Sequence, residues 1–239
     1  MFKAVFYNNE YLLKALIKSI LDYYDIDIDL TDKEIIKTNN YLSTEYYRDK
    51  QFVCDFNIII DENTEMNIEI NKSKYIGLTE RNLTYSFKIY CEHFNAGDKY
   101  DKFKNYSFFQ INFNHFKNRN GKIINKYYFI DAEDLHNQLT NNFSILNVDI
   151  AKCMEIVYNN GNLDEISDLC VFGAIINCDY LEDIESILER GLLNMDKENK
   201  EKFIGDIKRA SKDKTVKEAI KLEESLDDRF NYIAAMERN

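Results

Sequence analysis

Residues 51–75 read QFVCDFNIIIDENTEMNIEINKSKY, two runs of alternating side chains joined by a polar turn at residues 61–64. The turn offers Asp and Asn, which favour turns, and both runs are rich in strand-forming residues, so this stretch predicts a β-hairpin. A turn centred near Asn63 sets Asp55 opposite Asn71 and Asn57 opposite Glu69. We expect the rest of the chain to be built around this hairpin.

Alternation divides the predicted hairpin into two faces, because successive side chains of a strand point to opposite sides. One face is apolar and would join the core: Cys54, Phe56, Ile58, Ile60, Met66, Ile68 and Ile70. The other face is polar and acidic: Asp55, Asn57, Glu65, Asn67, Glu69 and Asn71. The residues alone leave two interpretations of this polar face open, a sheet surface in contact with water or a site at which carboxylates converge.

The composition is that of a globular protein with a sizeable core. The chain has 239 residues, of which 45% are hydrophobic and 14% aromatic, enough for one domain with an appendage or for two small domains. The longest strongly apolar run, residues 169–176, is too short to span a bilayer, and the N-terminus begins with an amphipathic helical pattern, not a signal peptide. We therefore expect a cytoplasmic protein that does not enter the membrane.

Cysteine and histidine spacing argues against two further classes of protein. The five cysteines form no CxxC pair and the three histidines are widely spaced, so neither a disulfide framework nor a zinc site is indicated. No organic cofactor is expected.

Charge is unevenly distributed along the chain. The formal net charge is −11, yet residues 71–126 hold 11 Lys and Arg against 4 Asp and Glu, a local +7. A basic stretch directly after an acidic hairpin is typical of a surface that approaches a phosphate backbone, although a solvated basic surface would give the same count.

Helical and strand patterns flank the hairpin. Residues 2–24 predict a core-packing helix, interrupted near Asn9, and residues 34–40 a first strand. Residues 76–95 predict a second helix with two opposite stripes, an apolar one of Leu83, Phe87, Tyr90 and Phe94 and a polar one of Arg81, Tyr85, Lys88 and Glu92. Residues 106–113 and 123–130 predict two more strands joined by a turn at 118–121. The result is a mixed α/β core covering residues 1–131.

Residues 132–239 have a different pattern, with helical segments and no convincing strand pair. The expected helices are residues 133–140, 149–158, 163–177, 180–191, 196–211 and 214–236. The last of them has a broad apolar face that would dock on the core or on a second subunit, so a homodimer is included among the expected partners.

Three stretches together resemble a known family. They are FKAVF with LLKALIKSIL (residues 2–6 and 12–21), FVCDFNIIIDENTEMNIEIN (52–71) and LTERNLTYSFKIYCEHFNAGDKY (78–100), and they are similar to the recombination-promoting nucleases and transposases of the PD-(D/E)XK superfamily. The resemblance implies a restriction-endonuclease-like α/β core, a mixed sheet flanked by helices, with an all-α C-terminal extension. It also implies a metal-dependent carboxylate site that cuts DNA.

The resemblance assigns roles to individual residues. Asp55 matches the motif's aspartate, Glu69 matches the second acid, and Asn71 stands in the place of the motif's lysine. Asn71 carries no charge, and Lys72 cannot replace the lysine because its side chain would point to the opposite face of the strand. Arg81 or Lys88 of the following helix is therefore the expected substitute. The residues expected to bind DNA are Arg81, Tyr85, Lys88, Lys72 and Lys74.

The leading hypothesis from sequence is thus a metal-dependent DNA endonuclease of mobile-element or defence type. Mg²⁺, with Mn²⁺ as a substitute, would be held by Asp55, Glu69 and the backbone carbonyl of Ile70, because it prefers hard oxygen ligands and retains several waters. Asn71 would position a water. The alternative is a catalytically inactive nuclease-fold scaffold that binds a protein partner through its acidic helical region, and an RNA-directed activity also stays open.

Overall fold

The structure is a computed structural model that describes residues 5–6, 9–37, 41–42, 52–53, 55–92, 97, 99–159, 166–178, 180–190, 193 and 195–212. The described chain divides into two compact units. One contains residues up to 30, 115–117 and those from 150 onward, and the other contains residues 31–114 and 118–149. Neither unit begins or ends at residue 131, where the sequence predicted the domain boundary. The expected helix at residues 214–236 lies outside the described residues.

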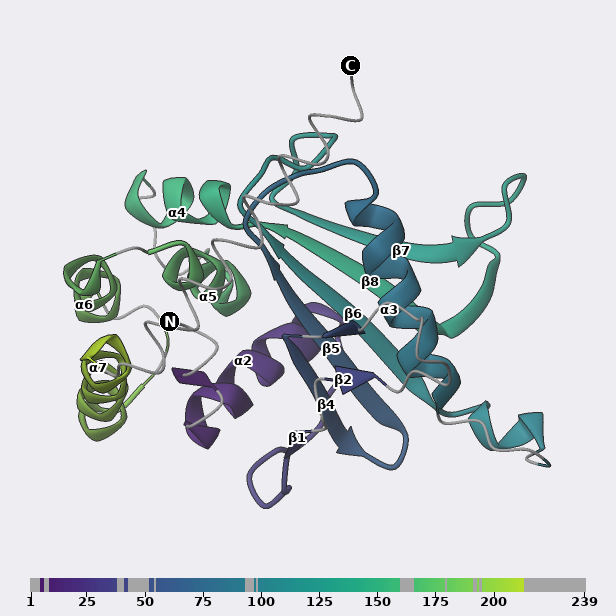
Figure 1. Cartoon of the computed structure of the whole chain (residues 1–239), viewed down its shortest axis with the longest axis horizontal. Helices are drawn as coiled ribbons and strands as arrows, with labels where there is room; N and C mark the ends of the chain where they lie inside the picture. Colours follow the sequence, from purple (N-terminus) through teal and green to yellow (C-terminus); the bar gives the residue numbers. More distant parts are fainter. Residues whose placement is uncertain are drawn as a thin grey trace. The chain divides into compact units, whose positions relative to one another are not determined.

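The second unit is organised around a mixed sheet (Figure 1). Its six described strands follow the order β1-β4-β5-β6-β8-β7, with β5, β6 and β8 parallel and the remaining neighbours antiparallel. The strands are β1 (Ile36–Lys37), β4 (Phe56–Asp61), β5 (Thr64–Asn71), β6 (Ser107–Asn114), β7 (Ile124–Ile130) and β8 (Gln138–Asp149). β2 (Tyr41–Leu42) and β3 (Phe52–Val53) form a separate pair, and a 3-10 helix, η1, covers Tyr100–Phe103. The predicted mixed α/β class is confirmed.

The predicted hairpin forms as β4 and β5, but in a different register. Asp61 pairs with Thr64, which leaves a two-residue turn, and an irregularity between Ile59 and Asp61 then sets Phe56 opposite Ile68. The expected pairing of Asn57 with Glu69 is therefore wrong, because Asn57 faces Asn67. A shift of two residues leaves every side chain on its predicted face, and it moves Asp55 toward Glu69 instead of Asn71.

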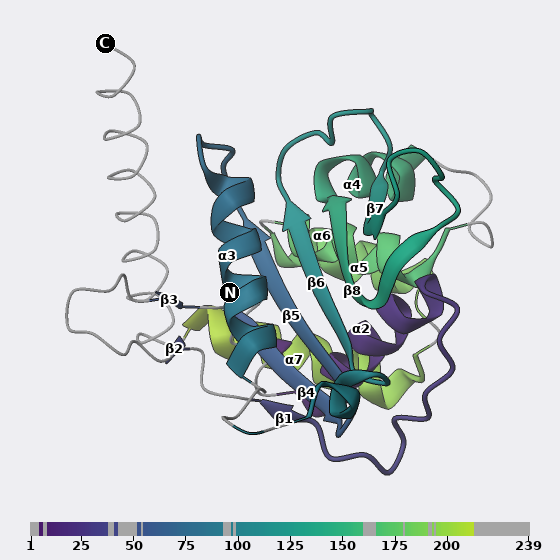
Figure 2. The same cartoon turned by 90° about the vertical axis from the view of Figure 1, so that its right-hand side faces the viewer.

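The polar face of the hairpin is not a solvated surface. Helix α3 (Leu78–Glu92) lies across this face of the sheet, as Figures 1 and 2 both show. Five polar side chains on this face are each 5% exposed or less: Asn57, Glu65, Asn67, Glu69 and Asn71. The interpretation of this face as water-covered is wrong.

The face of α3 that packs on the sheet differs from the predicted one. Phe87, expected in the core stripe, is 42% exposed, whereas the buried stripe is Leu78, Asn82, Tyr85, Ser86 and Ile89. Two polar residues, Asn82 and Ser86, point inward because the sheet beneath them is polar and supplies hydrogen-bond partners. Near the other end of α3 the contact becomes apolar, through Tyr85, Ile89, Tyr106, Phe108 and Phe143.

The expected helix at residues 133–140 is also wrong, since Gln138 begins β8, a strand of 12 residues. β8 inserts between β6 and β7 and pairs with both, so β6 and β7 do not form the hairpin that the turn at 118–121 suggested. Three parallel strands, β5, β6 and β8, thereby end side by side. Their carboxyl ends form one end of the sheet.

The other unit is helical in its described part. It contains α2 (Glu10–Tyr23), α4 (Ile150–Asn159), α5 (Asp168–Asn177), α6 (Leu181–Glu189) and α7 (Lys197–Lys212). The predicted interruption near Asn9 is confirmed, since the Asn9 side chain caps α2 by accepting a hydrogen bond from the backbone of Leu12 at 3.1 Å. The apolar run at residues 169–176 is fully buried in α5. None of the described helices has both the length and the apolarity needed to cross a bilayer.

Candidate active site

Asp55 and Glu69 meet at the carboxyl end of β5. Asp55 lies in a bend just before β4, and its backbone N–H donates to Oε1 of Glu69 at 3.3 Å. In return, the backbone N–H of Ile70 donates to Oδ2 of Asp55 at 2.8 Å. These two reciprocal bonds hold the side chains beside one another, so the structure brings together the two acids that the sequence singled out.

The environment of Glu69 disfavours its charged form. The residue is 3% exposed, and burial, followed by the nearby Asp55 carboxylate, raises its pKa to about 8. The Arg81 guanidinium and the hydrogen bonds from Asp55 and Asn67 act in the opposite direction. The two neighbouring carboxylates, one of them buried, repel each other when both are charged, and a bound cation would relieve this repulsion.

Arg81, in the first turn of α3, brings a positive charge to this pair. Its guanidinium donates to Oδ1 of Asn71 at 3.0 Å and approaches Oε2 of Glu69 at 3.5 Å. The guanidinium also lies over the ring of Tyr85, 5.3 Å from its centre, and near the ring of Tyr75 at 5.8 Å. Between the two expected substitutes for the missing lysine, the geometry favours Arg81.

The other residues predicted to bind DNA lie at different distances from the acids. Lys88 is two helical turns beyond Arg81, about 10 Å along α3. Tyr85 is 9% exposed and packs into the apolar cluster. Lys72 and Lys74 are exposed on the connection from β5 to α3, at the same end of the sheet as Glu69.

A buried carboxamide network surrounds the acids, and sequence reasoning did not identify it. Asn67 donates to Oε1 of both Gln110 and Glu69, at 2.9 and 3.3 Å. Gln110 in turn donates to Asn112 at 2.8 Å and accepts from Ser86 at 2.8 Å. Asn82 donates to Asn112 at 3.1 Å, which fastens α3 to the sheet next to Arg81.

The same network continues toward the neighbouring strands. Asn71 donates to Asn114 at 2.9 Å, and Asn112 donates to Asn147 at 2.8 Å. A signal for it exists in the sequence, because Gln110, Asn112 and Asn114 alternate with apolar residues just as the hairpin does. These amides share a face with Glu69 through the parallel register of β5, β6 and β8.

The donor set at the acids fits a hard divalent cation with open coordination positions. Two carboxylates are available, and the described residues contain no cluster of three or more His, Cys, Asp or Glu side chains that could enclose a metal. Mg²⁺ is commonly bound through one or two carboxylates and completes its shell with water and substrate oxygens. A structural zinc site, which takes four protein ligands, does not fit these residues.

Comparison with known protein families gives a match over nearly the whole chain. A family model described as PD-(D/E)XK nuclease family transposase matches residues 1–234. No curated protein and no solved structure is significantly similar to the chain. The match extends through the helical region as well as the hairpin and α3, beyond the stretches on which the resemblance was based.

Proposed function

The chain belongs to the PD-(D/E)XK nuclease family transposases, and on that premise we propose that it is a metal-dependent endonuclease that hydrolyses phosphodiester bonds in DNA. The biological setting that we propose is mobile-element recombination or defence. The observation that carries the proposal is the pairing of Asp55 with the buried Glu69 at the carboxyl end of β5.

In this proposal Asp55 and Glu69 hold the cation, with the carbonyl oxygen of Ile70 as a third protein ligand. When bound, Mg²⁺ or Mn²⁺ polarises a phosphoryl group and lowers the pKa of a coordinated water. The hydrogen bond from the Ile70 backbone to Asp55 and that from Asn67 to Glu69 orient the two carboxylates. The chain thus supplies a fixed pair of ligands beneath α3.

Arg81 takes over the charge that lysine provides in the family motif. A guanidinium can bind a phosphate through two parallel hydrogen bonds, and the stack on Tyr85 restricts its orientation. Asn71 accepts from Arg81 and donates to Asn114. We therefore assign Asn71 to orient Arg81, in place of the water-positioning role expected from sequence, and buried Tyr85 to support Arg81 without contacting DNA.

The backbone of DNA is the expected ligand of the exposed cations near the site. Lys72 and Lys74 lie exposed on the β5–α3 connection, where they would contact phosphates near the one that is cleaved. Such contacts position a duplex without reading its sequence, so cutting should depend on salt more than on sequence.

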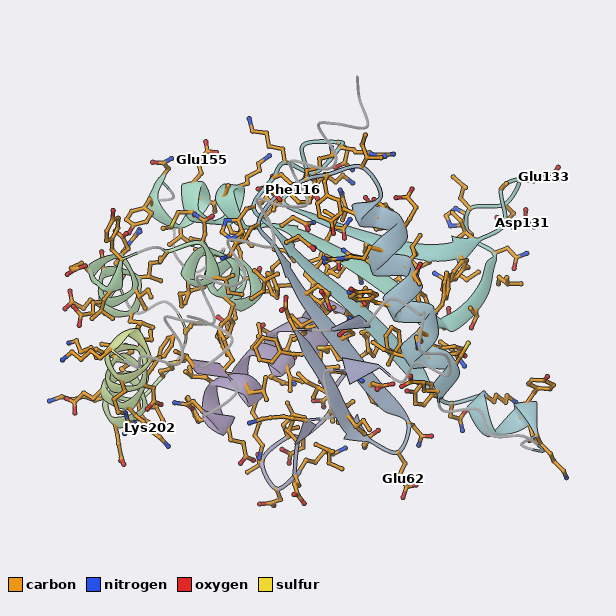
Figure 3. The ribbon with its side chains drawn as sticks, in the orientation of Figure 1. Glu62, Phe116, Asp131, Glu133, Glu155 and Lys202 are labelled. Atoms are coloured by element: carbon orange, nitrogen blue, oxygen red, sulfur yellow. The ribbon has the colours of Figure 1, made fainter. Side chains whose placement is uncertain are left out.

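A plasmid-nicking assay with Mg²⁺ tests this function. Asp55→Ala should lower the rate of nicking by at least about 100-fold, because it removes one of two ligands and leaves Glu69 alone. Glu62→Ala is the matched control, since Glu62 is an exposed acid in the turn at the other end of the same hairpin (Figure 3). Equal nicking by the wild type and Asp55→Ala would refute the assignment.

Calorimetric titration with Mn²⁺ separates an enzyme from a catalytically inactive scaffold. The enzyme should release or absorb heat on binding the ion, and Glu69→Gln should abolish that heat. A scaffold that binds a partner through its acidic helical region would show no heat that depends on Glu69.

A further inference from the structure

The connection between β6 and β7 carries a short basic loop, residues 118–123, that the proposed chemistry does not use. Its four central residues, Arg119 to Lys122, are exposed. The loop contains two cations and no acid, and within the described part of the chain neither Arg119 nor Lys122 forms an ion pair. Two unneutralised charges therefore face solvent from one short segment.

The backbone of the basic loop is held by a buried side chain. Asn118 is 8% exposed, and its amide nitrogen lies 2.9 Å from the carbonyl oxygens of both Lys122 and Ile123 and 3.2 Å from that of Asn147. The loop is closed further by the Gly121 N–H, which donates to the carbonyl of Asn118 at 3.1 Å. Gly121 has a φ of +68°, which glycine adopts without strain. Arg119 and Lys122 are thus presented from a preorganised turn.

The basic loop lies at the same end of the sheet as the acids. Glu69 pairs with Asn112, and Asn112 with Asn147, the residue whose carbonyl contacts Asn118. Two strand spacings of about 4.8 Å separate β5 from β8, so the anchor of the loop is roughly 10 Å from the strand of Glu69. Figure 2 shows β6 and β8 pointing to this end, with the β6–β7 connection arching over it.

Charge differs between the two ends of the sheet. The opposite end of β7 leads into an exposed acidic connection that contains Asp131, Glu133 and Asp134, and Figure 3 shows Asp131 and Glu133 at its outer end. The end that holds Glu69 instead has Lys72, Lys74, Arg119 and Lys122 exposed around it. These four cations would attract a polyanion to the end that holds the acids.

We propose that the basic loop binds the phosphate backbone of duplex DNA alongside the Asp55–Glu69 pair, with Arg119 and Lys122 each contacting a phosphate. This inference rests on the proposed function. Because the loop is anchored two strands away from the strand of Glu69, these contacts would lie on phosphates a few nucleotides from the one at the acids. The loop would fix the register of the duplex without reading its bases.

Fluorescence anisotropy with a labelled duplex of about 20 base pairs tests the inference, measured in EDTA so that no strand is cut. The double variant Arg119→Gln/Lys122→Gln should bind on the order of 10- to 100-fold more weakly at 50 mM salt, and the slope of log Kd against log salt should fall by about 1.8, as expected for two lost phosphate contacts. The matched control is Lys14→Gln/Lys18→Gln on α2, which removes the same charge from ammonium groups paired with Glu10 and Asp22 at 2.9 and 2.8 Å. This control should bind as the wild type does.

A second variant, Asn118→Ala, tests the contribution of the loop conformation separately from that of its charge. It retains both cations but removes the side chain that braces them, so affinity should fall several-fold while the salt slope stays near the wild-type value. Circular dichroism of each variant checks that the fold is retained.

Unchanged affinity and salt slope in the double variant would overturn the inference while leaving Asp55-dependent nicking, and with it the proposed function, intact. A wild-type protein that does not bind the duplex, or that releases it to an equal concentration of single-stranded RNA, would also overturn it. Loss of affinity in the double variant with unchanged binding by the α2 control would support it.

Discussion

Glu69 makes the stability of the metal-free protein depend on pH. In the unfolded chain its carboxyl loses a proton near the ordinary pKa of 4.5, whereas in the folded protein the pKa is raised to about 8 by burial and by Asp55. Between these two values the folded state binds more protons than the unfolded state. The stability linked to Glu69 is therefore fully present below pH 4.5 and is lost as the pH rises toward 8.

The difference between the wild type and Glu69→Gln measures this effect. In EDTA, the free energy of unfolding of the wild type should fall between pH 5 and pH 8.5 relative to that of Glu69→Gln, by up to roughly 4 kcal/mol for a shift of this size. The amide cannot ionise, so it removes the pH dependence that originates at this position. Parallel stability curves for the two proteins over this range would contradict a raised pKa at the buried Glu69.

At the level of elements, α3 is unusual in facing the sheet with polar groups. Asn82 and Ser86 are buried and bond to Asn112 and Gln110, while the same helix packs through Tyr85 and Ile89 farther along. The polar contact keeps Arg81 close to Asn71 and Glu69. Because each buried polar group depends on its partners, this interface should be sensitive to the loss of any one amide.

Gln110 has three partners in the network, as many as Asn112, and its replacement tests the interface. Gln110→Met retains the approximate volume but removes an acceptor for Asn67 and Ser86 and a donor to Asn112. Urea unfolding should show a loss of about 1–3 kcal/mol. Thr79→Ala, at an exposed position of the same helix, should change stability by less than about 0.5 kcal/mol. A Gln110→Met protein as stable as this control would show that the network contributes no net stability.

At the scale of the whole molecule, the acids belong to the unit of residues 31–114 and 118–149, and the described helices α2 and α4 to α7 belong to the other. A ligand that binds only the folded state stabilises the unit that contains its site. Metal binding at Asp55 and Glu69 should therefore be visible as a change in thermal unfolding of the sheet-containing unit.

Scanning calorimetry with Mg²⁺ checks this expectation. At a free concentration 100 times the dissociation constant, the ion should add about 2.7 kcal/mol to the free energy of unfolding, which corresponds to a rise in Tm of roughly 5–10 °C for a protein of this size. Asp55→Ala should show no rise, and EDTA should reverse the rise in the wild type. An equal rise in both proteins would place the metal elsewhere.

Much of the fold followed from local patterns in the chain. Alternation in residues 51–75 assigned Asp55, Glu69 and Asn71 to one face. The predicted register was wrong by two residues, and a shift of two leaves each side chain on its face, so this assignment is correct. Helical periodicity located α2, α3 and α4 to within a few residues. The sequence carried no comparable signal for β8, whose run QLTNNFSILNVD mixes polar and apolar residues on both faces.

By itself the sequence determined which residues share a face, because side-chain direction depends only on local backbone geometry. Only the tertiary structure decided what covers that face. Packing of α3 on the sheet buried Glu69, placed Arg81 beside it and connected both to the amides of β6. Insertion of β8 next to β6 aligned the ends of three parallel strands and set the basic loop at the end that holds the acids. These relations join residues that are far apart in the chain, and no local pattern encodes them.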